Sequence, residues 1–277
     1  IMVLIDDPQR TVIEPLFERD LELAYDLELM LGGGHLRGWH IDDEKLIDEI
    51  AGHITQLSRG EPPMNYAMGD GNHSFATARA VWEQLKEEAQ DDLMVMNHPA
   101  RYALVELVNV HDEGMEFEPI HRTVFGVDAG GLLRDLEAHC AGLEFSRRTF
   151  ADRDSWDAAC RGAAATGGHH IPYLSGAERG LISIGKPGFK LAVASLQVFL
   201  DRYLDAHPLA SLDYIHGEEV VEQLAAERDS IGFLLPVMNK HDLFETIVID
   251  GATPRKTFSL GEAEEKRYYL ECRRLAP

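Results

Sequence analysis

The sequence predicts an α+β protein with a mixed sheet, and three observations support this class. Runs typical of strands, such as 1–5 and 101–110, are interspersed with runs of helical period, such as 42–58. These runs do not alternate regularly as strand, helix and strand, so a mixed sheet fits as well as a parallel one. A chain of 277 residues, 45% hydrophobic and 27% charged, is also large and apolar enough for one globular domain or two.

The first ninety residues combine apolar runs with clear boundary signals. Asp42 or Asp43 provides a helix N-cap, and the apolar positions that follow it recur every three or four residues. Glycines 32–34 provide the turn of a hairpin, whose strands carry Tyr, Leu and Trp at alternating positions. The expected elements are a strand at 1–5, a short helix at 11–19, hairpin strands at 21–30 and 35–41, a helix from 42 or 43 to 58, a strand at 65–68 and a helix at 74–89.

The rest of the chain continues this mixture of elements. A weakly marked division near residue 126 separates an N-terminal region, residues 1–126, from a C-terminal region, residues 127–277, although one domain fits the sequence as well. The expected strands are 101–110, 118–125, a short one near 145, a hairpin of 170–174 and 181–184, and 231–237 and 246–249. The expected helices are 129–141, 155–165, 192–206, 218–228 and a charged helix at 261–274.

Charge and cysteine content exclude several classes of protein. The formal net charge of −22 argues against nucleic acid or an anionic membrane as a partner, because both bind most strongly to clustered Lys and Arg. A small phosphate ligand needs only a local pocket of donors. The three cysteines lie far apart, and the sequence shows no signal peptide and no apolar run approaching the ~20 residues of a membrane span. We therefore expect a cytoplasmic protein, and the oligomeric state stays open.

The start of the chain and one pair of adjacent histidines also stand out. The chain opens at Ile1 inside an apolar run typical of a buried strand, which indicates that further sequence precedes it. His169 and His170 resemble a metal-binding pair only superficially, because adjacent strand residues face opposite sides. We therefore set this pair aside, and the metal stays unknown.

The strongest functional motif is the run Gly69-Asp70-Gly71-Asn72-His73-Ser74, where a strand is expected to turn into a helix. Glycines on both sides of an aspartate permit a tight turn and the close approach of a ligand. The start of a helix favours an anion, through its free N–H groups and its dipole. Asp70 is suited to act as a general base or to hold magnesium, and His73 to donate or carry protons. In the alternative interpretation, Asp70 or Asn72 only caps the helix.

Three other runs carry candidate phosphate contacts. His121 and Arg122 follow a proline and offer two cationic donors, unless they belong to an edge strand with solvated charges. His216 lies in a segment, 213–217, that is typical of either a ligand-facing turn or a structural Asx turn. Arg255 and Lys256 form a basic pair that stands out in so acidic a chain.

Seven motifs occur together in one order along the chain. They are Ile5-Asp6-Asp7-Pro8, Gly69 to Ser74, the stretch from His98-Pro99-Ala100-Arg101-Tyr102 to Asn109, Glu118-Pro119-Ile120-His121-Arg122, Asp213 to Gly217, Gly232-Phe233-Leu234-Leu235-Pro236 and the segment from Pro254 to Arg273. In this the chain resembles a bacterial and archaeal family, domain of unknown function 1015, over essentially its whole length. Members of that family normally carry a long further segment before this point, and the family name implies no activity.

The turn by itself is similar to the Asp-Gly-His-His-Arg motif of serine kinases with the ParB/sulfiredoxin-like fold. This similarity implies a ParB-like element around residues 65–90, with Asp70 as the base or metal-holding acid and His73 as a phosphate contact or proton shuttle. Asn72 replaces the first histidine and Ser74 replaces the arginine, so a fixed bidentate phosphate donor is lost. Either Arg122, Arg255 or Lys256 replaces that donor, or the activity differs.

These observations lead to three hypotheses. The first is a phosphotransferase or phosphohydrolase that acts on a small phosphorylated metabolite or nucleotide, with serine or phosphoserine as candidates and Mg²⁺ and ATP or ADP as implied cofactors. The second is a regulatory protein that binds a nucleotide or metabolite without catalysis. In the third, the turn is structural and function lies at a protein interface.

Overall fold

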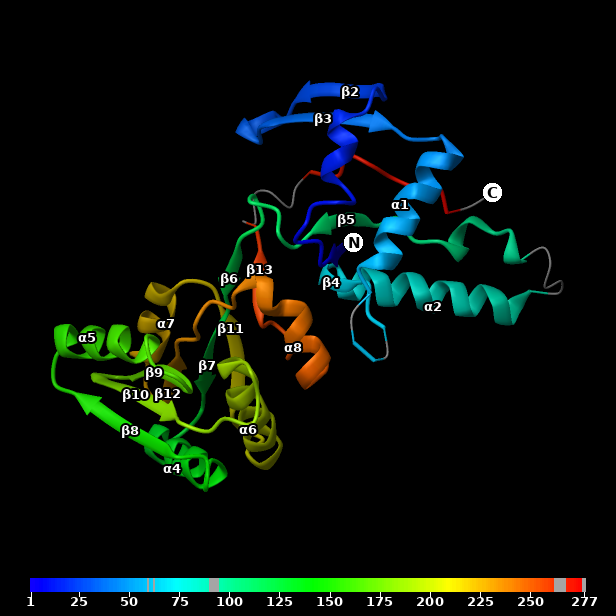
Figure 1. The fold of residues 1–277 in the computed structure, drawn as a ribbon. Coiled ribbons are helices and arrows are strands. Elements are labelled where there is room, and N and C mark those ends of the chain that lie inside the picture. The colour runs from blue at the N-terminus through cyan, green and yellow to red at the C-terminus, as the bar shows by residue number, and fades with distance from the viewer. Residues whose placement is uncertain (59, 62, 90–94, 262–267, 276–277) are drawn as a thin grey trace. The chain divides into compact units, whose positions relative to one another are not determined.

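The structure is a computed structural model that describes residues 1–58, 60–61, 63–89, 95–261 and 268–275 (Figure 1). The chain divides into two compact units. Unit 1 comprises residues 1–116 together with the segment from 260 onward, and unit 2 comprises residues 117–259. The predicted division at residue 126 therefore falls inside unit 2.

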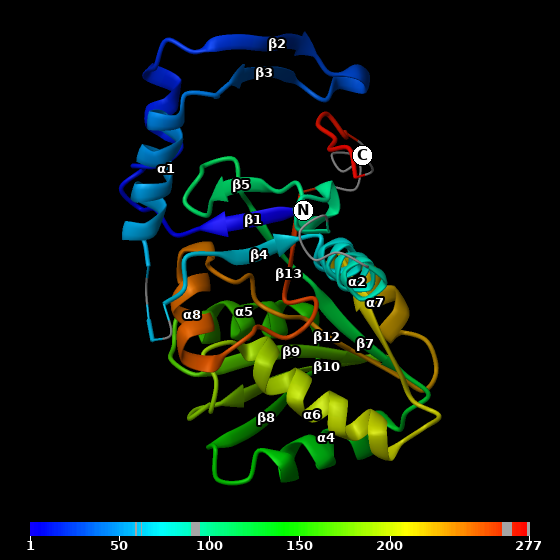
Figure 2. The ribbon, with the colours of Figure 1, turned by 90° about the vertical axis from the view of Figure 1, so that its right-hand side faces the viewer.

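Unit 1 is built on a small mixed sheet with a separate hairpin. In the order β4-β1-β5, β1 is antiparallel to β4 and parallel to β5 (Figure 2). The strands β2 and β3 pair only with each other among the described residues. The elements of unit 1 are β1 (Met2–Ile5), η1 (Glu14–Glu18), β2 (Glu22–Glu28), η2 (Met30–Gly32), β3 (His35–His40), α1 (Glu44–Gln56), β4 (Ala67–Asp70), α2 (Asn72–Glu88), η3 (Pro99–Arg101) and β5 (Glu106–Asn109).

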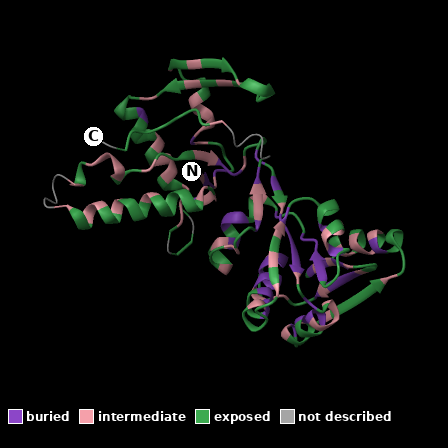
Figure 3. Cartoon of the chain, turned by 180° about the vertical axis from the view of Figure 1, so that it is seen from behind, coloured by how far each residue is buried: buried purple, intermediate pink, exposed green. Residues whose placement is uncertain are grey.

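Burial in unit 1 is concentrated on few residues. Leu4 and Ile5 of the central strand β1 are completely buried, as an apolar strand between two neighbours should be. Asp43 caps α1 by accepting a hydrogen bond from the amide of Lys45, as the sequence predicted. By contrast, α2 has no buried residue, although it is 17 residues long (Figure 3).

Unit 2 contains a six-stranded sheet in the order β11-β7-β12-β9-β10-β8, and every pair of neighbouring strands is antiparallel. A second, two-stranded sheet pairs β6 with β13. The elements are β6 (Phe117–Pro119), β7 (His121–Phe125), α4 (Ala129–His139), β8 (Phe145–Phe150), α5 (Arg153–Ala164), β9 (His169–Ser175), β10 (Glu178–Ile184), α6 (Ala192–Ala206), β11 (Ser211–Ile215), α7 (Glu218–Ala225), β12 (Ser230–Phe233), η4 (Lys240–Asp242), α8 (Leu243–Asp250) and β13 (Phe258–Leu260).

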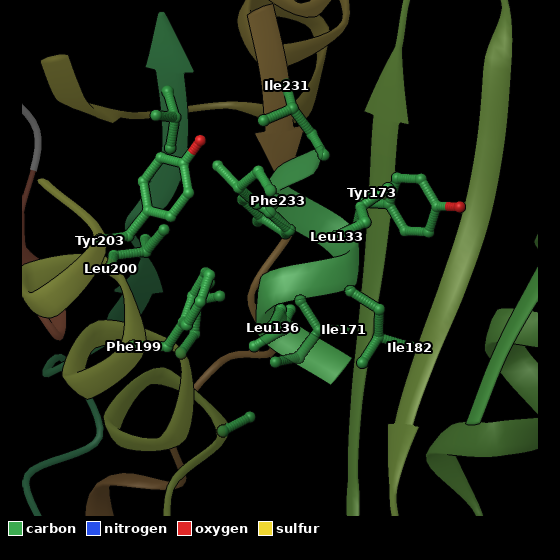
Figure 4. Close-up of a cluster of buried hydrophobic side chains, with 14 of the residues drawn as sticks. Leu133, Leu136, Ile171, Tyr173, Ile182, Phe199, Leu200, Tyr203, Ile231 and Phe233 are labelled. Atoms are coloured by element: carbon green, nitrogen blue, oxygen red, sulfur yellow. The ribbon is translucent and has the colours of Figure 1, made fainter. Parts of the chain in front are cut away.

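The core of unit 2 lies on both faces of the large sheet. On one face, α4 and α6 pack Leu133, Leu136, Phe199 and Leu200 against the strands (Figure 4). On the other face, α5 and α7 contribute a smaller cluster around Trp156 and Val221. The helices on both faces of this antiparallel sheet, together with the mixed sheet of unit 1, confirm the predicted α+β class.

Two predicted segments belong to another kind of element. Residues 246–249, predicted as a strand, lie in the helix α8, since a short apolar run fits either structure by periodicity alone. Residues 213–215, predicted to lie in a turn, instead end the strand β11. There, they pair with β7 over the register from Ser211↔Phe125 to Ile215↔His121.

Three other predicted segments differ from the structure in their bounds or in the extent of regular structure. Of 101–110, only Glu106–Asn109 is a strand, because only those residues pair with β1. The segment 118–125 breaks at Ile120 into β6 and β7, which join different sheets. The charged helix predicted at 261–274 is not present over 268–274, where the chain has no regular structure, and 262–267 lie outside the described residues.

Candidate functional site

The Gly69–Ser74 run forms the predicted strand-to-helix turn, within unit 1. The strand β4 ends at Asp70, Gly71 adopts a left-handed conformation with φ 88°, and α2 begins at Asn72. Asp70 lies opposite Met2 of β1, so the neighbouring strand fixes the position of the turn. The structure therefore places all six residues of this motif at one end of the three-stranded sheet.

Both glycines of the turn lie close to the first residues of the chain. A Cβ atom at Gly71 would lie 3.1 Å from Cα of Ile1 and would also need an unfavourable positive φ. A Cβ atom at Gly69 would lie 3.1 Å from Cγ of Leu4, a side chain that would have to shift by a few tenths of an ångström. The fold thus explains Gly71 by itself and favours Gly69, so the argument for a ligand depends on the polar groups.

The start of α2 has no capping side chain among the residues that the structure describes. The N-cap residue is Gly71, and no described side chain forms a capping hydrogen bond there. The alternative that Asp70 or Asn72 only caps this helix is therefore not what the structure shows. Because the first-turn amides of a helix have no partner within it, α2 presents uncapped donors at its positive end.

The side chains around these amides are open to solvent. Asp70, Asn72, His73 and Ser74 are all exposed. One carboxylate oxygen of Asp70 accepts a hydrogen bond of 2.7 Å from the amide of Gly71, which orients the carboxylate beside the helix start. Among the described residues, no group of three or more His, Cys, Asp or Glu side chains could hold a metal ion. A magnesium ion at Asp70 would therefore need ligands from a bound phosphate or from water.

In unit 2, the remaining candidate residues converge on β7 and β11. Arg122 lies opposite Tyr214 across these strands, with its guanidinium 4.7 Å from the ring centroid. Arg255 stacks on the same ring at 5.9 Å. Three runs that lie far apart in the sequence are thus brought together around one tyrosine.

Arg122 is completely buried and donates to protein oxygens. Its Nε donates to Oε1 of Gln197 at 3.0 Å, and its two terminal nitrogens donate to the carbonyl groups of Ile120 and Arg255. Burial, more than any neighbouring charge, lowers the pKa of Arg122 to about 10. Arg122 therefore joins β7, α6 and the segment before β13.

His121 and Arg122 do not act as a pair of adjacent donors. Successive residues of a strand face opposite sides, and the Nδ1 atom of His121 accepts a hydrogen bond of 3.0 Å from the amide of Leu235. Burial, followed by the charges of Arg122 and His216, lowers the pKa of His121 to about 4. His121 is thus a neutral, buried acceptor, and the predicted pair of cationic donors on one anion is corrected accordingly.

The other basic candidates are exposed. His216 lies 3.4 Å from the hydroxyl of Ser259, and Arg255 pairs with Asp201 at 3.1 Å. Lys256 is exposed and has a φ of 57°, which is uncommon for a residue other than glycine. All of these residues belong to unit 2, whereas the Gly69–Ser74 turn belongs to unit 1. Their predicted role as phosphate contacts stays a prediction.

Comparison with known proteins identifies the family. The profile described as "Protein of unknown function (DUF1015)" matches residues 1–245. The chain belongs to this family. No curated protein matches it. A solved structure described as a conserved hypothetical protein from Pyrococcus furiosus is similar, with 15% sequence identity, a TM-score of 0.46 and coverage of 72% of each chain.

This DUF1015 chain has a further polar network to which sequence reasoning assigned no role. It lies at the carboxyl ends of the parallel strands β1 and β5. Asp7, almost completely buried, accepts hydrogen bonds from the amides of Thr11 and Val12. Asn109 donates to the carbonyl of Asp7 at 2.8 Å. The signal in the sequence was an acidic pair directly after one strand and an asparagine at the end of another.

The same network includes a contact between a histidine and an aspartate near the surface. Nε2 of His111 lies 2.7 Å from Oδ1 of Asp6, and both side chains are 14% exposed. The amide of His111 also donates to Oδ1 of Asn109 at 3.2 Å. These bonds connect the segments that follow β1 and β5. The network therefore stabilises the sheet whose strand β4 leads into the Gly69–Ser74 turn.

In the described part of the chain, no helix is both long enough and apolar enough to cross a membrane. Cys140, Cys160 and Cys272 are free cysteines, of which Cys140 is buried and Cys272 exposed.

Proposed function

We propose that this protein transfers or hydrolyses a phosphoryl group on a small metabolite or nucleotide, at the Gly69–Ser74 turn. The observation that carries the proposal is the uncapped start of α2 beside an exposed carboxylate and an exposed histidine. The amides of the first helical turn are suited to bind phosphate oxygens. Phosphoryl transfer requires mainly such positioning and the neutralisation of charge.

Each side chain of the turn has a role in this proposal. Asp70 holds a magnesium ion against the phosphate or accepts the proton of the attacking hydroxyl. His73, in the first turn of α2, contacts a phosphate oxygen or carries the proton to it. Gly69 and Gly71 keep the backbone close to the ligand, and Asn72 and Ser74 add hydrogen-bond donors. Serine and phosphoserine are the candidate substrates, with ATP or ADP as the nucleotide and the cytoplasm as the location.

The proposal for the turn rests on the groups of unit 1 alone. The role of Arg122, Arg255, Lys256, His121 and His216 of unit 2 as phosphate contacts stays a prediction from the sequence, and Arg122 and His121 are already bonded to protein groups.

A second candidate function is binding of a nucleotide or metabolite without catalysis. The exposure of Asp70 and His73 favours it, because catalytic groups usually work where water is excluded. One oxygen of Asp70 is also already engaged by the amide of Gly71.

The first test is thermal unfolding with ATP, ADP, CTP, serine and phosphoserine, each with and without Mg²⁺. A ligand that binds only the native state raises the unfolding temperature, in proportion to ~RT ln(1 + [L]/Kd). We expect one of these ligands to raise it and His73→Ala to remove the effect.

The second test separates catalysis from binding. We expect Asp70→Asn to reduce turnover of the ligand that binds by about a hundredfold or more, at an unchanged unfolding temperature. Asp48→Asn on α1 is the matched control, because it removes one exposed carboxylate from the same unit. Turnover at the wild-type rate by Asp70→Asn would reject the catalytic role, and binding without any product would favour the second candidate function.

A further inference from the structure

Unit 2 contains a cavity beside the first residues of β9, apart from every residue of the Gly69–Ser74 turn. Its volume of about 680 Å³ is in the range of ligand sites. The lining includes residues of α5 and of α6, which cover opposite faces of the large sheet, and also the start of β9 and the segment 234–239 that follows β12. A cavity that is lined from both faces lies in the layer of the sheet itself, where a further strand would fit.

The first residues of β9 have a neighbouring strand on one side only, within the described part of the chain. On that side, β9 pairs with β10 from end to end, beginning at His169↔Ile184. On the other side, β12 pairs with β9 at two positions, and the last bond of this ladder runs from the amide of Leu234 to the carbonyl of Pro172. Before Pro172, β9 is therefore no longer accompanied by β12.

Two prolines explain why this ladder ends. In an antiparallel pair, every second residue of a strand directs both its N–H and its C=O group to the same neighbour, so His170 presents its groups on the same side as Pro172. Pro172 has no N–H for the carbonyl of Leu234, and the register of β12 would place a second proline, Pro236, opposite His170. Among the described residues, neither the amide nor the carbonyl of His170 forms a hydrogen bond on this side.

These two groups of His170 are suited to bind a ligand. They point toward the side that β12 has left, and His170 is half-buried and lines the cavity. Its ring is already held by the protein, through contacts of 2.9 Å with the hydroxyl of Ser183 and 2.8 Å with that of Thr166. Unpaired N–H and C=O groups along a strand are the usual template for the addition of another strand, and their burial without a partner is unfavourable.

Apolar side chains line the cavity on both faces of the sheet. On the α5 side these are Trp156, Cys160 and Leu234, and on the α6 side they are Leu191, Val193 and Leu235. Successive side chains of a strand point to opposite faces. A strand beside β9 would therefore meet an apolar wall with each of its side chains, as strands that are covered on both faces usually do.

We propose that this cavity binds a short extended peptide of about three residues, as an added strand antiparallel to β9. The central residue would exchange two hydrogen bonds with the amide and the carbonyl of His170. Its side chain would lie on the α5 side, where the ring of His170 contacts Thr166, and the two flanking side chains would lie on the α6 side. Recognition thus depends on the main chain of the peptide and on its apolar side chains.

Three blocked tripeptides test this recognition by titration calorimetry with the whole chain. They are acetyl-Val-Leu-Val-amide, the same peptide with an N-methyl group on its central residue, and acetyl-Ser-Leu-Ser-amide. Both ends are blocked because the lining carries charges of both signs, among them Lys190, Glu218 and Asp242.

We expect acetyl-Val-Leu-Val-amide to bind with a Kd of about 1 mM or below. The N-methyl peptide cannot donate to the carbonyl of His170, so it should bind at least about tenfold more weakly. The serine peptide lacks the apolar flanks and should also bind more weakly. Equal binding of either altered peptide, or no binding of acetyl-Val-Leu-Val-amide, would overturn the proposal.

Amide hydrogen exchange locates the peptide at one residue. In the free protein, the amide of His170 should exchange faster than that of Ile171, which faces β10 in the ladder. Saturation with acetyl-Val-Leu-Val-amide should slow exchange at His170 by about tenfold or more and change Ile171 little. If the peptide binds and exchange at His170 stays the same, the peptide lies elsewhere and the proposal is rejected.

His170→Pro removes the donor on the open side of β9. A strand tolerates proline where the missing N–H has no partner in the ladder, as Pro172 shows two residues further on. His170→Ala is the matched control, because it also removes the ring but keeps the amide. We expect His170→Ala to bind acetyl-Val-Leu-Val-amide at least about tenfold more tightly than His170→Pro does.

Equal affinities of these two variants, both with the far-ultraviolet circular dichroism spectrum of wild type, would contradict the proposal, because the amide of His170 would then make no contact. Where His170→Pro fails to fold, the exchange measurement on wild type decides by itself.

Discussion

The Gly69–Ser74 turn and the Arg122 network carry residues that the sequence indicated for the same task, yet their surroundings are opposite. The polar side chains of the turn are exposed, on a helix without buried residues. Arg122 is completely buried, and its three nitrogens bond to protein oxygens. The turn has unused donors and little core, whereas the Arg122 network has core and few unused donors.

This difference indicates how each region should respond to substitution. Where a polar group is buried and bonded, its removal leaves several partners unpaired, so stability should change most. Where polar groups are exposed, their removal should affect a ligand and leave stability almost unchanged. The following predictions compare the two regions in order of expected effect.

The largest effect is expected at Arg122. Arg122→Met should lower the free energy of unfolding of unit 2 by about 3–4 kcal/mol, because Gln197 and two carbonyl groups lose their donor. Arg255→Gln is the matched control. Its side chain is 66% exposed, so loss of its pair with Asp201 should cost less than about 1 kcal/mol. Urea unfolding of both variants, followed by fluorescence, measures the difference. Similar costs would show that the burial of Arg122 contributes little.

The second effect concerns pH and His121. Its pKa in the folded protein is about 4, below the ordinary value of 6.5, because burial disfavours the charged ring. As the pH falls below 6.5, the unfolded chain takes up this proton first, so the folded state loses stability until the pH reaches about 4. The contribution of His121 is therefore fully present above pH 6.5.

The size of this effect is about 2 kcal/mol between about pH 7 and about pH 4.5. Burial also lowers the pKa of His169, so wild type must be compared with a variant that lacks His121 alone. In urea unfolding at several pH values, His121→Gln should lose less stability on acidification than wild type. Parallel pH curves for the two proteins would show that His121 does not titrate in this range.

The fold and the two regions could be predicted from the sequence only in part. The helix α6 was predicted with the observed bounds, because its many apolar residues repeat at the helical period and most of them are buried in the core of unit 2. The Gly69–Ser74 turn was predicted because its signal is local. The burial of Arg122 depends on Gln197, 75 residues away, and on a carbonyl 133 residues away, so no local pattern could reveal it.

A cavity in unit 2 that is lined by α6 and by the segment 251–255 escaped prediction for the same reason, because these two segments are distant in sequence. Residues 246–249 of α8 were predicted as a strand, so this segment was assigned to the wrong kind of element. Residues 213–215 of β11 were predicted to lie in a turn, so the register that places Tyr214 opposite Arg122 was not foreseen.

The smallest effect is expected within unit 1, where two glycines differ in conformation. Gly71 has a φ of 88° and little space for a Cβ atom, so Gly71→Ala should cost about 1–2 kcal/mol and tilt the start of α2. Gly52 lies inside α1, and a Cβ atom there would meet no other atom within 4 Å, so Gly52→Ala should stabilise α1 by up to about 1 kcal/mol.

Amide hydrogen exchange of α1 and α2 distinguishes these two outcomes within one unit. Gly71→Ala should speed exchange in α2 and weaken whichever ligand raises the unfolding temperature, whereas Gly52→Ala should slow exchange in α1 and leave ligand binding as it was. If Gly71→Ala weakens the ligand without faster exchange in α2, then Gly71 acts through close contact with the ligand. If exchange rises and affinity is unchanged, the turn is structural, and phosphate handling must be sought outside residues 69–74.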